Sequence, residues 1–451
     1  MDGRLAPSQR LPPTRELARR LEVSRNTVSL AYEHLAADGI LVGRVGDGSF
    51  VSSRPLGRES QRHAPAGSVS SKPVWNSIPL SFTRPPGVTY DYDFGVGIPD
   101  PRLFPFTEWR RLTAREWRPS AEHGRYQAPA GHPSLRAAIA RHIGVSRAVK
   151  AGADDVIVTQ GAQQAFDLIG RILISPGSCV AVEEPGYPFV RKLFQGLGAR
   201  VIGVPVDKEG LVIKAIPPAA RLLYVTPSHQ FPLGYTMSIE RRMQLLACAE
   251  RHPLIIIEDD YDSEFRFSGR PLDPLQTLDR SGRVIYVGSF SKVLLPTLRI
   301  GFLITPASLR SALLLAKQLT DWHSDLTKQV VLAKFIDQGL LAKHIRKMNR
   351  EYAPRYFKIA DVLQRDFHNW LRLIPTASGL HATAELCEDS EVDINAVVTT
   401  ARKRGVFVLP LANYFHDRPR TGLVIGYGAI QSDKIKGGMK RLESIFHEAS
   451  E

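Results

Sequence analysis

The sequence contains little cysteine, no long apolar run and no internal repeat. Its three cysteines, Cys179, Cys248 and Cys387, are far apart and lack the spacing of metal ligands. We therefore expect neither a metal site nor a disulfide framework, as in a reducing compartment. Apolar stretches such as 313–315 are too short to span a bilayer, and the polar first residues predict no signal peptide. These absences together indicate a cytoplasmic protein without a membrane partner.

Size and charge indicate several domains and a polyanionic partner. The 451 residues exceed what one ordinary hydrophobic core requires. The formal net charge is +14 at pH 7, which favours double-stranded DNA as a partner because a basic surface attracts phosphates. Solvated arginine-rich faces would produce the same excess, so charge alone does not decide.

Three regions of the chain differ in composition. Residues 1–52 carry short helical patterns, residues 53–80 are rich in Ser, Pro, Gly and Arg, and residues 81–451 alternate apolar runs with amphipathic stretches. The middle region predicts a flexible linker. The last predicts an α/β domain with a largely parallel sheet, whose large lobe spans about 90–307 and whose smaller lobe spans about 308–451. Its expected strands are 156–158, 178–182, 200–204, 221–225, 254–258 and 284–287, with helices such as 163–173 and 239–251 between them.

The first 52 residues predict two helices followed by a hairpin. Thr14 follows two prolines and is expected to cap the first helix, and Ser24 is expected to cap a second helix over about 25–37. Residues 40–44 and 48–51 alternate around the glycine-rich turn at Gly46. This order of elements describes a winged helix-turn-helix. The residues expected to face inward are Leu17, Ala18, Leu21, Val28, Ala31 and Leu35.

Polar residues of this module are placed to contact DNA. Arg25, Asn26 and Thr27 form the first turn of the second helix, where recognition helices present side chains to base edges. Phosphate contacts are expected at the start of the preceding helix and at the wing. The alternative is that all these residues are ordinary exposed polar groups. Arg15 and Arg44 are expected to contact phosphates, and Thr14 is also expected to contact DNA.

The segment from Leu11 to Val51, LPPTRELARRLEVSRNTVSLAYEHLAADGILVGRVGDGSFV, resembles the DNA-binding domain of the GntR family over nearly its whole length. That family's domain starts with an extra helix before the segment equivalent to residues 3–8. We expect either an upstream start codon, which we favour, or a truncated domain. A missing helix would expose apolar surface on Leu17, Leu21 and Leu35.

A lysine in the second domain is suited to hold an aldehyde cofactor. Lys292 ends the segment Gly-Ser-Phe-Ser-Lys, just after a predicted buried strand, where its amine can form a Schiff base. Ser289, Ser291 and Arg299 can hold a phosphate nearby, the arginine through paired charged hydrogen bonds. The Ser-x-Ser-Lys pattern alone occurs often by chance, so the surrounding motifs matter.

Three further segments supply the rest of such a site. Asp259 ends an apolar strand, where a carboxylate can pair with a pyridinium nitrogen, and Tyr261 can donate to a phenolate oxygen. Tyr187 follows another strand and is suited to stack on a flat ring, or alternatively to pack in a turn. Backbone N–H groups at the start of a helix can receive phosphate. The residues at that helix start are Gly161, Ala162 and Gln163.

These segments, from about Tyr90 to the C-terminus, resemble fold-type I pyridoxal-phosphate enzymes and specifically the aminotransferase-like domain of MocR regulators. The resemblance implies that Lys292 is the Schiff-base lysine, that Asp259 pairs with the pyridine nitrogen, and that Tyr187 stacks on the ring as the third catalytic residue. It also implies that Tyr126, in Tyr-Gln-Ala-Pro-Ala-Gly, reaches the phosphate of a neighbouring subunit. The remaining implied contacts to pyridoxal 5'-phosphate are Tyr261, Gly161, Ala162, Gln163, Ser289, Ser291 and Arg299.

Two departures put amino-acid turnover in question. Phe231 stands where many aminotransferases have an asparagine that bonds the cofactor oxygen, so Tyr261, His229 or Gln230 must compensate. Val424 stands where aminotransferases keep an arginine that clamps the substrate carboxylate. Arg418 or Arg420 could replace that arginine, although a nearby charge is weaker than a bidentate clamp.

Two functions remain in competition, and the first is favoured. In the first, the chain is a transcription regulator, expected to be a homodimer, whose second domain senses pyridoxal phosphate or its adduct with an amine or amino-acid effector. A variant of this hypothesis senses the cofactor alone. In the second, the chain is an active aminotransferase that carries a DNA-binding appendage.

Overall fold

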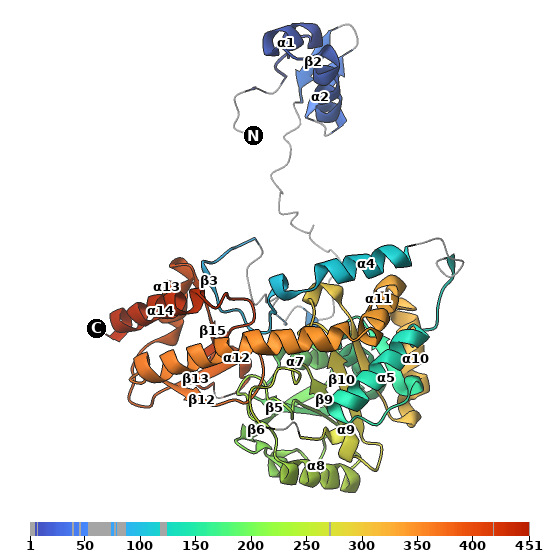
Figure 1. Cartoon of the computed structure of the whole chain (residues 1–451), viewed down its shortest axis with the longest axis vertical. Coiled ribbons are helices and arrows are strands. Elements are labelled where there is room, and N and C mark those ends of the chain that lie inside the picture. Colours follow the sequence, from blue (N-terminus) through green and yellow to red (C-terminus); the bar gives the residue numbers. More distant parts are fainter. Residues whose placement is uncertain are drawn as a thin grey trace. The chain divides into compact units, whose positions relative to one another are not determined.

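A computed structural model describes residues 5–6, 8–37, 40–44, 47–52, 74–75, 78, 87–117, 124–269, 272–417 and 419–450. Contacts divide the chain into two units, Met1–Ser71 and Lys72–Glu451 (Figure 1). Most of the linker predicted over 53–80 lies outside the described residues, as does Gly46 of the predicted turn. Trp75, inside that predicted range, is described, and its ring lies against Gly196, where a Cβ would meet it at 3.0 Å.

The first unit consists of two helices and a two-stranded sheet, as the sequence predicted. Helix α1 (Thr14–Leu21) packs on α2 (Arg25–Ala37). Strand β1 (Leu41–Arg44) pairs antiparallel with β2 (Gly48–Val51), with Arg44 opposite Gly48. Ser24 caps α2, because its Oγ accepts the Thr27 N–H at 3.1 Å. Thr14 was expected to cap α1, but the cap position is Pro13 and no side chain accepts a hydrogen bond there.

The core of this unit is small. Ala18, Val28 and Leu41 are its buried apolar residues. Of the three leucines named above, Leu21 is 59% exposed, whereas Leu17 and Leu35 are half-buried. Ala31 was expected to face inward but is exposed, although its spacing puts it on the same side of α2 as Val28 and Leu35.

The second unit contains an eight-stranded sheet in the order β4-β11-β10-β9-β8-β5-β6-β7. Neighbouring strands are parallel except that β11 is antiparallel to both β10 and β4, and β7 to β6. The sheet is therefore mixed and mostly parallel, as predicted, although β11 and β7 were not predicted. The strands are β4 (Val156–Thr159), β5 (Cys179–Glu184), β6 (Arg200–Asp207), β7 (Gly210–Leu211), β8 (Leu222–Val225), β9 (Ile255–Asp260), β10 (Val284–Ser289) and β11 (Gly301–Ile304).

Helices cover both faces of this sheet, so alternate strand residues are buried on opposite sides. Ile257 and Val287 pack with α6, α7 and α10, whereas Ile256 and Val284 pack with α8 and α9. Towards β4, helices α4, α5, α11 and α12 contribute to another cluster. Their bounds are α4 (Phe106–Glu116), α5 (Pro133–Arg147), α6 (Ala162–Leu173), α7 (Pro188–Gly196), α8 (Ile239–Arg251), α9 (Leu275–Leu278), α10 (Ala307–Asp321), α11 (Leu326–Asp337) and α12 (Leu340–Asp366).

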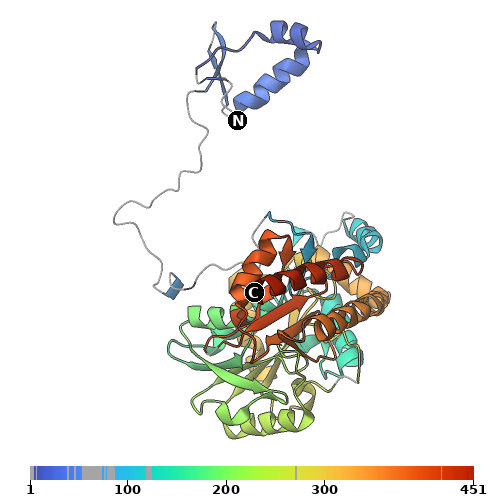
Figure 2. The same cartoon turned by 90° about the vertical axis from the view of Figure 1, so that its left-hand side faces the viewer.

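A second sheet, in the order β12-β13-β16-β15, forms the smaller lobe. Helices α13 and α14 lie side by side near the C-terminus (Figures 1 and 2), and β3 pairs parallel with β14. None of the helices in the described part of the chain is long and apolar enough to cross a membrane. The elements are β3 (Tyr92–Asp93), β12 (Leu371–Ile374), β13 (His381–Leu386), α13 (Ile394–Lys403), β14 (Val406–Phe407), β15 (Leu409–Pro410), β16 (Gly422–Gly426) and α14 (Lys434–Ser450).

The predicted lobe boundary near residue 308 does not match the packing. Helix α10 contacts α6, and α11 contacts α4 and α5, so both helices pack on elements of the large lobe. Helix α12 contacts both α11 and the small-lobe strands β12 and β13. We therefore propose that the boundary lies along α12.

Candidate cofactor site and DNA-binding surface

Lys292 lies just beyond the end of β10, in the wall of a cavity of about 350 Å³. Its Nζ donates a hydrogen bond to the Gly97 carbonyl at 2.7 Å. Removal of water lowers the pKa of Lys292, while the carboxylates of Asp262 and Asp259 oppose that decrease. A lysine with a lowered pKa is more often neutral, and the neutral amine is the form that attacks an aldehyde.

Asp259 reaches the same cavity from the adjacent strand, because β9 is parallel to β10 and places Asp259 opposite Val287. Its Oδ2 accepts the Tyr224 hydroxyl at 2.6 Å, whereas its buried Oδ1 has no hydrogen-bond partner. Burial raises the pKa of Asp259 to about 7, although the bond from Tyr224 works in the opposite direction. A buried carboxylate oxygen without a partner is costly, so this oxygen marks a place for a donor.

The neighbouring acid, Asp260, is held differently. It forms a buried ion pair with Arg147 at 2.8 Å and accepts the Tyr286 hydroxyl at 2.6 Å. Successive residues of a strand point to opposite faces of the sheet. Of the two adjacent acids, Asp259 is therefore the one that lines the cavity.

Two tyrosines also line the cavity. Tyr187 is the residue before α7, and burial raises its pKa to about 12. Its ring meets the Phe231 ring edge-on, with centroids 6.1 Å apart. The Tyr261 hydroxyl lies 2.9 Å from Nδ1 of His229. Both tyrosines keep their hydroxyl protons at neutral pH, because burial also raises the pKa of Tyr261.

A cradle suited to phosphate lies at the start of α6. Gly161 precedes this helix with φ 77°, and a Cβ there would be 3.0 Å from Arg299 Nη1. Arg299 donates to the Gln160 carbonyl at 2.8 Å. The Ser291 N–H donates to Ser289 Oγ at 3.1 Å. Free N–H groups and the positive end of the helix dipole favour an anion at this position.

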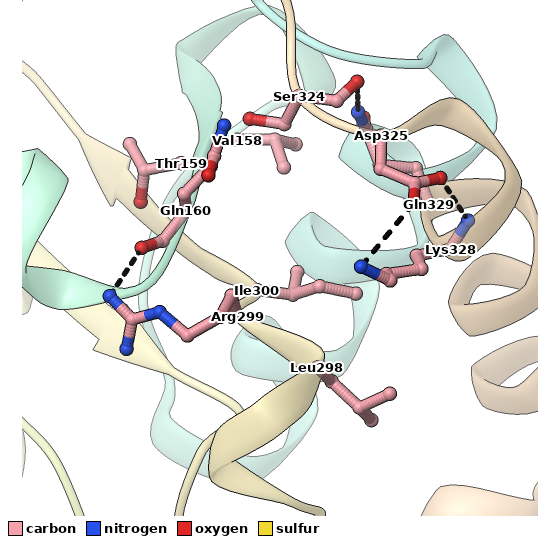
Figure 3. Close-up of a pocket in the computed structure, with 10 residues that line it drawn as sticks. All are labelled: Val158, Thr159, Gln160, Leu298, Arg299, Ile300, Ser324, Asp325, Lys328 and Gln329. Atoms are coloured by element: carbon pink, nitrogen blue, oxygen red, sulfur yellow. Dashed lines mark hydrogen bonds and ion pairs between the residues drawn. The ribbon is translucent and has the colours of Figure 1, made fainter. Parts of the chain in front are cut away.

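The outer side of this cradle adjoins a second, small cavity of about 70 Å³ (Figure 3). Figure 3 shows Arg299 and Gln160 on one side of it and the start of α11 on the other, where Lys328 lies near Asp325. Asp321 at the end of α10 accepts the Gln160 side chain at 3.0 Å. The loop before α6 is thus held by Arg299 and by α10.

The structure brings most of the predicted cofactor-binding residues to one cavity. Gly161 adjoins the cavity through Arg299. Tyr126 does not reach the cavity of its own chain, since it is 79% exposed and packs against Trp322 with ring centroids 5.1 Å apart. The predicted residues that line the cavity are Ala162, Gln163, Tyr187, Asp259, Tyr261, Ser289, Ser291, Lys292 and Arg299.

Sequence reasoning missed several lining residues. Tyr224 is the penultimate residue of a predicted strand and bonds Asp259, and an aromatic residue near a strand end could have suggested it. Gly97, which accepts from Lys292, and His381, which comes from β13, carried no recognisable signal.

The structure shows the neighbours of Val424 and Phe231, the two residues at which the sequence departs from aminotransferases. Val424 is fully buried in an apolar cluster with Leu233 and Tyr414. Arg420 pairs with Glu385 at 2.6 Å, while Arg418 lies outside the described residues. Phe231 packs edge-on against Tyr414 and Tyr261, with centroids 4.9 and 5.9 Å apart.

The predicted DNA-contacting residues lie mostly at the surface of the first unit. Arg25, Asn26 and Thr27 are exposed on the first turn of α2, although Thr27 Oγ1 also contacts Ser24 Oγ at 2.8 Å. Arg15 is exposed and Thr14 is half-buried. Arg44 is exposed at the end of β1, with its guanidinium 4.7 Å from the Phe50 ring centroid.

Comparison with known families agrees with both halves of this description. Residues 92–419 match the family "Aminotransferase class I and II", and residues 1–51 match "Bacterial regulatory proteins, gntR family". The chain therefore belongs to the aminotransferase class I and II family and carries a GntR-type DNA-binding domain. This combination defines a MocR-type transcription regulator that binds DNA, and pyridoxal 5'-phosphate is the cofactor of its fold-type I domain.

The similar proteins include transcription regulators and an aminotransferase. The chain is 38% identical over 98% of its length to the probable rhizopine catabolism regulatory protein MocR of Rhizobium meliloti, of which it covers 90%. It is 33% identical over 96% of its length to the pyridoxine biosynthesis transcriptional regulator PdxR of Corynebacterium glutamicum, covering 90% of that protein. Among solved structures, kynurenine aminotransferase of Pyrococcus horikoshii is similar with a TM-score of 0.74 and 29% identity, over 80% of this chain and 92% of that one.

Proposed function

We propose that this regulator holds pyridoxal phosphate in the cavity between β9, β10 and α6, and that the cofactor or its adduct with an amine or amino acid controls DNA binding by a homodimer in the cytoplasm. The observation that carries the proposal is the buried Asp259 Oδ1, which has no partner and lines the same cavity as the Lys292 amine. A protonated pyridine nitrogen would satisfy this oxygen and keep it ionised.

The residues of the cavity fit the parts of this cofactor. Lys292 would bind its aldehyde carbon, Asp259 its ring nitrogen, and Tyr261 its phenolate oxygen. Tyr187 would stack on the ring. The aldehyde supplies a reactive carbon for amines, and the protonated ring withdraws electrons from it. The phosphate would be held by Gly161, Ala162, Gln163, Ser289, Ser291 and Arg299, which surround the start of α6.

A homodimer is supported by the surface around Tyr126. This exposed ring packs on Trp322, which is 46% exposed, and Leu319 on the same helix end is 79% exposed. A second subunit would bury these apolar side chains and bring Tyr126 to its phosphate site. Because Asp321 joins α10 to the Gln160 loop, the cradle and this surface share one helix.

An electrophoretic mobility shift with the full-length protein tests the regulatory proposal. We expect it to bind the region upstream of its own gene more tightly than random DNA at moderate salt, and pyridoxal phosphate or an amine to change that affinity. The Lys292→Ala variant is the matched control, since it keeps the DNA-binding unit but cannot form the Schiff base. Equal affinity for both DNAs, with and without cofactor, would reject the proposal.

Amino-acid turnover is tested separately by an absorbance scan with candidate amino acids. Conversion of the cofactor to its pyridoxamine form, followed by return of the aldehyde form when a 2-oxo acid is added, would instead support an aminotransferase.

A further inference from the structure

We infer that His229 and Asp262 position the Tyr261 hydroxyl as a hydrogen-bond donor toward the cofactor's phenolate oxygen, where Phe231 offers no polar group. The inference rests on the cofactor site proposed above. It assigns a positioning role to a buried histidine–aspartate pair whose aspartate lines the cavity and whose histidine lies behind it.

The three side chains meet at one ring nitrogen. His229 Nδ1 lies 2.9 Å from Asp262 Oδ1, 3.1 Å from Asp262 Oδ2 and 2.9 Å from the Tyr261 hydroxyl. The histidine and aspartate side chains are only 1% and 2% exposed. Tyr261 itself lines the cavity. Asp262 lines it as well, whereas His229 is not among the lining residues and touches the hydroxyl of Tyr261 from behind.

Proton counting at this nitrogen fixes the direction of the tyrosine bond. A ring nitrogen carries either one hydrogen or one lone pair, and an ionised carboxylate only accepts. Since Asp262 approaches Nδ1 with both oxygens, Nδ1 must carry the hydrogen. The Tyr261 oxygen then cannot donate to Nδ1. Its own hydrogen remains available for an acceptor in the cavity, which is where the phenolate oxygen would lie.

The other candidates for this role are engaged elsewhere. The Gln230 amide donates to the carbonyls of Pro185 and Phe231, both at 2.8 Å, and accepts from the Leu233 N–H at 3.1 Å. His229, Asp262 and His381 also have ligand atoms within 4.8 Å of one another, as in a metal site. However, His381 Nε2 lies 2.9 Å from the Pro232 carbonyl, and both Asp262 oxygens lie within 3.1 Å of His229 Nδ1. A chain of hydrogen bonds from Asp262 through His229 to Tyr261, called the relay below, explains these contacts without an ion.

A spectroscopic titration of the cofactor-loaded protein tests the relay. The Schiff base of Lys292 absorbs visible light differently when protonated, so its pH midpoint can be measured directly. A donor on the phenolate oxygen weakens that oxygen's hold on the imine proton. Tyr261→Phe should therefore raise the midpoint, by about one pH unit for a tenfold change in proton affinity. The charged and titratable groups that face this region are Glu183, Asp259, Asp262, Lys292, Arg299, His381 and Tyr427.

His229→Leu should raise the midpoint in the same direction, and adding it to Tyr261→Phe should change little further. His344→Leu is the matched control. It removes another buried imidazole, on α12, which neither lines the cavity nor bonds Tyr261. The control should therefore titrate near the wild type. A wild-type midpoint in His229→Leu, or full additivity with Tyr261→Phe, would overturn the inference.

Asp262→Asn gives an independent test if His229→Leu does not fold. Loss of the negative charge alone would lower the midpoint, because an anion near the imine favours its protonation. Loss of the relay would instead raise the midpoint. The sign of the shift therefore shows whether Asp262 acts through its charge alone or through the relay. If the wild type shows no Schiff-base absorbance that Lys292→Ala abolishes, the proposed cofactor site fails. If that absorbance is present but the relay variants do not shift its midpoint, only this inference fails.

Discussion

Gly161→Ala tests the phosphate cradle through a contact that the structure defines. Gly161 has φ 77°, and an added Cβ would lie 3.0 Å from Arg299 Nη1 and 3.1 Å from its Cζ. With ψ 171°, Gly161 lies in a backbone region that almost only glycine adopts, where a side chain costs about 1–3 kcal/mol of folding stability. The new methyl group must in addition push the guanidinium aside by a few tenths of an ångström, which misaligns its hydrogen bonds to a bound phosphate. A charged hydrogen bond contributes about 1.5–3 kcal/mol, so pyridoxal phosphate affinity should fall roughly tenfold to a hundredfold.

Gly177→Ala is the matched control for this experiment. Gly177 has a similar φ of 84°, but a Cβ there meets nothing within 4 Å. It should therefore show the backbone cost in chemical unfolding and bind the cofactor as tightly as the wild type. Affinity is measured by titrating the cofactor-free protein and following the Schiff-base absorbance. If Gly161→Ala and Gly177→Ala bind the cofactor equally well, the cradle does not hold the phosphate.

Three further predictions concern the lysine, the aspartate and the DNA contacts. Lys292→Ala should lose the cofactor that borohydride traps covalently, and undiminished trapping would show that another lysine reacts. The raised pKa of Asp259, about 7 in place of 3.8, means that the cofactor-free fold prefers the protonated acid, so its stability should fall as pH rises from about 4 to 7. Asp259→Asn should remove that fall, by a few kcal/mol at most; identical pH profiles in chemical unfolding would contradict the assignment. Arg25→Ala should cost roughly 1–3 kcal/mol of affinity for the cognate DNA if Arg25 contacts a base, whereas Arg44→Ala should weaken all sequences alike and reduce the salt dependence, both measured by mobility shift.

The parts of the site that follow from strand order were predictable from the sequence. Asp259 and Lys292 each follow an apolar run, and parallel strands bring their carboxyl ends to one edge of a sheet. Ser24 was predictable as a helix cap for a similarly local reason, because the hydroxyl needs only the N–H three residues ahead. The same rule gave the wrong cap for α1, because Thr14 is already the first residue of that helix and Pro13 occupies the cap position.

What the sequence could not predict depends on packing between distant elements. His381 reaches the cavity from β13 because the small lobe packs beside the loop after β8, as its bond to Pro232 shows. The lobe boundary was misplaced because α10 and α11 are amphipathic helices like any others, and only their contacts with α4, α5 and α6 assign them to the large lobe. The link between His229 and Asp262 spans 33 positions of sequence, and neither residue belongs to a pattern that implies the other.

The surroundings of position 424 bear on whether such a site would act as an enzyme or as a sensor. At position 424, where the aminotransferase resemblance implies a carboxylate clamp, a fully buried valine packs in an apolar cluster. Recruiting Arg420 to replace that clamp would break its 2.6 Å pair with Glu385 and its contact with the Phe415 ring. Both losses oppose productive binding of an amino acid, since a bidentate clamp must be preorganised to be effective. Most of the groups suited to hold the cofactor nevertheless line the cavity. A site that keeps its cofactor contacts but has an apolar residue in place of the clamp favours ligand-dependent regulation over rapid turnover, in agreement with the regulators to which the chain is similar.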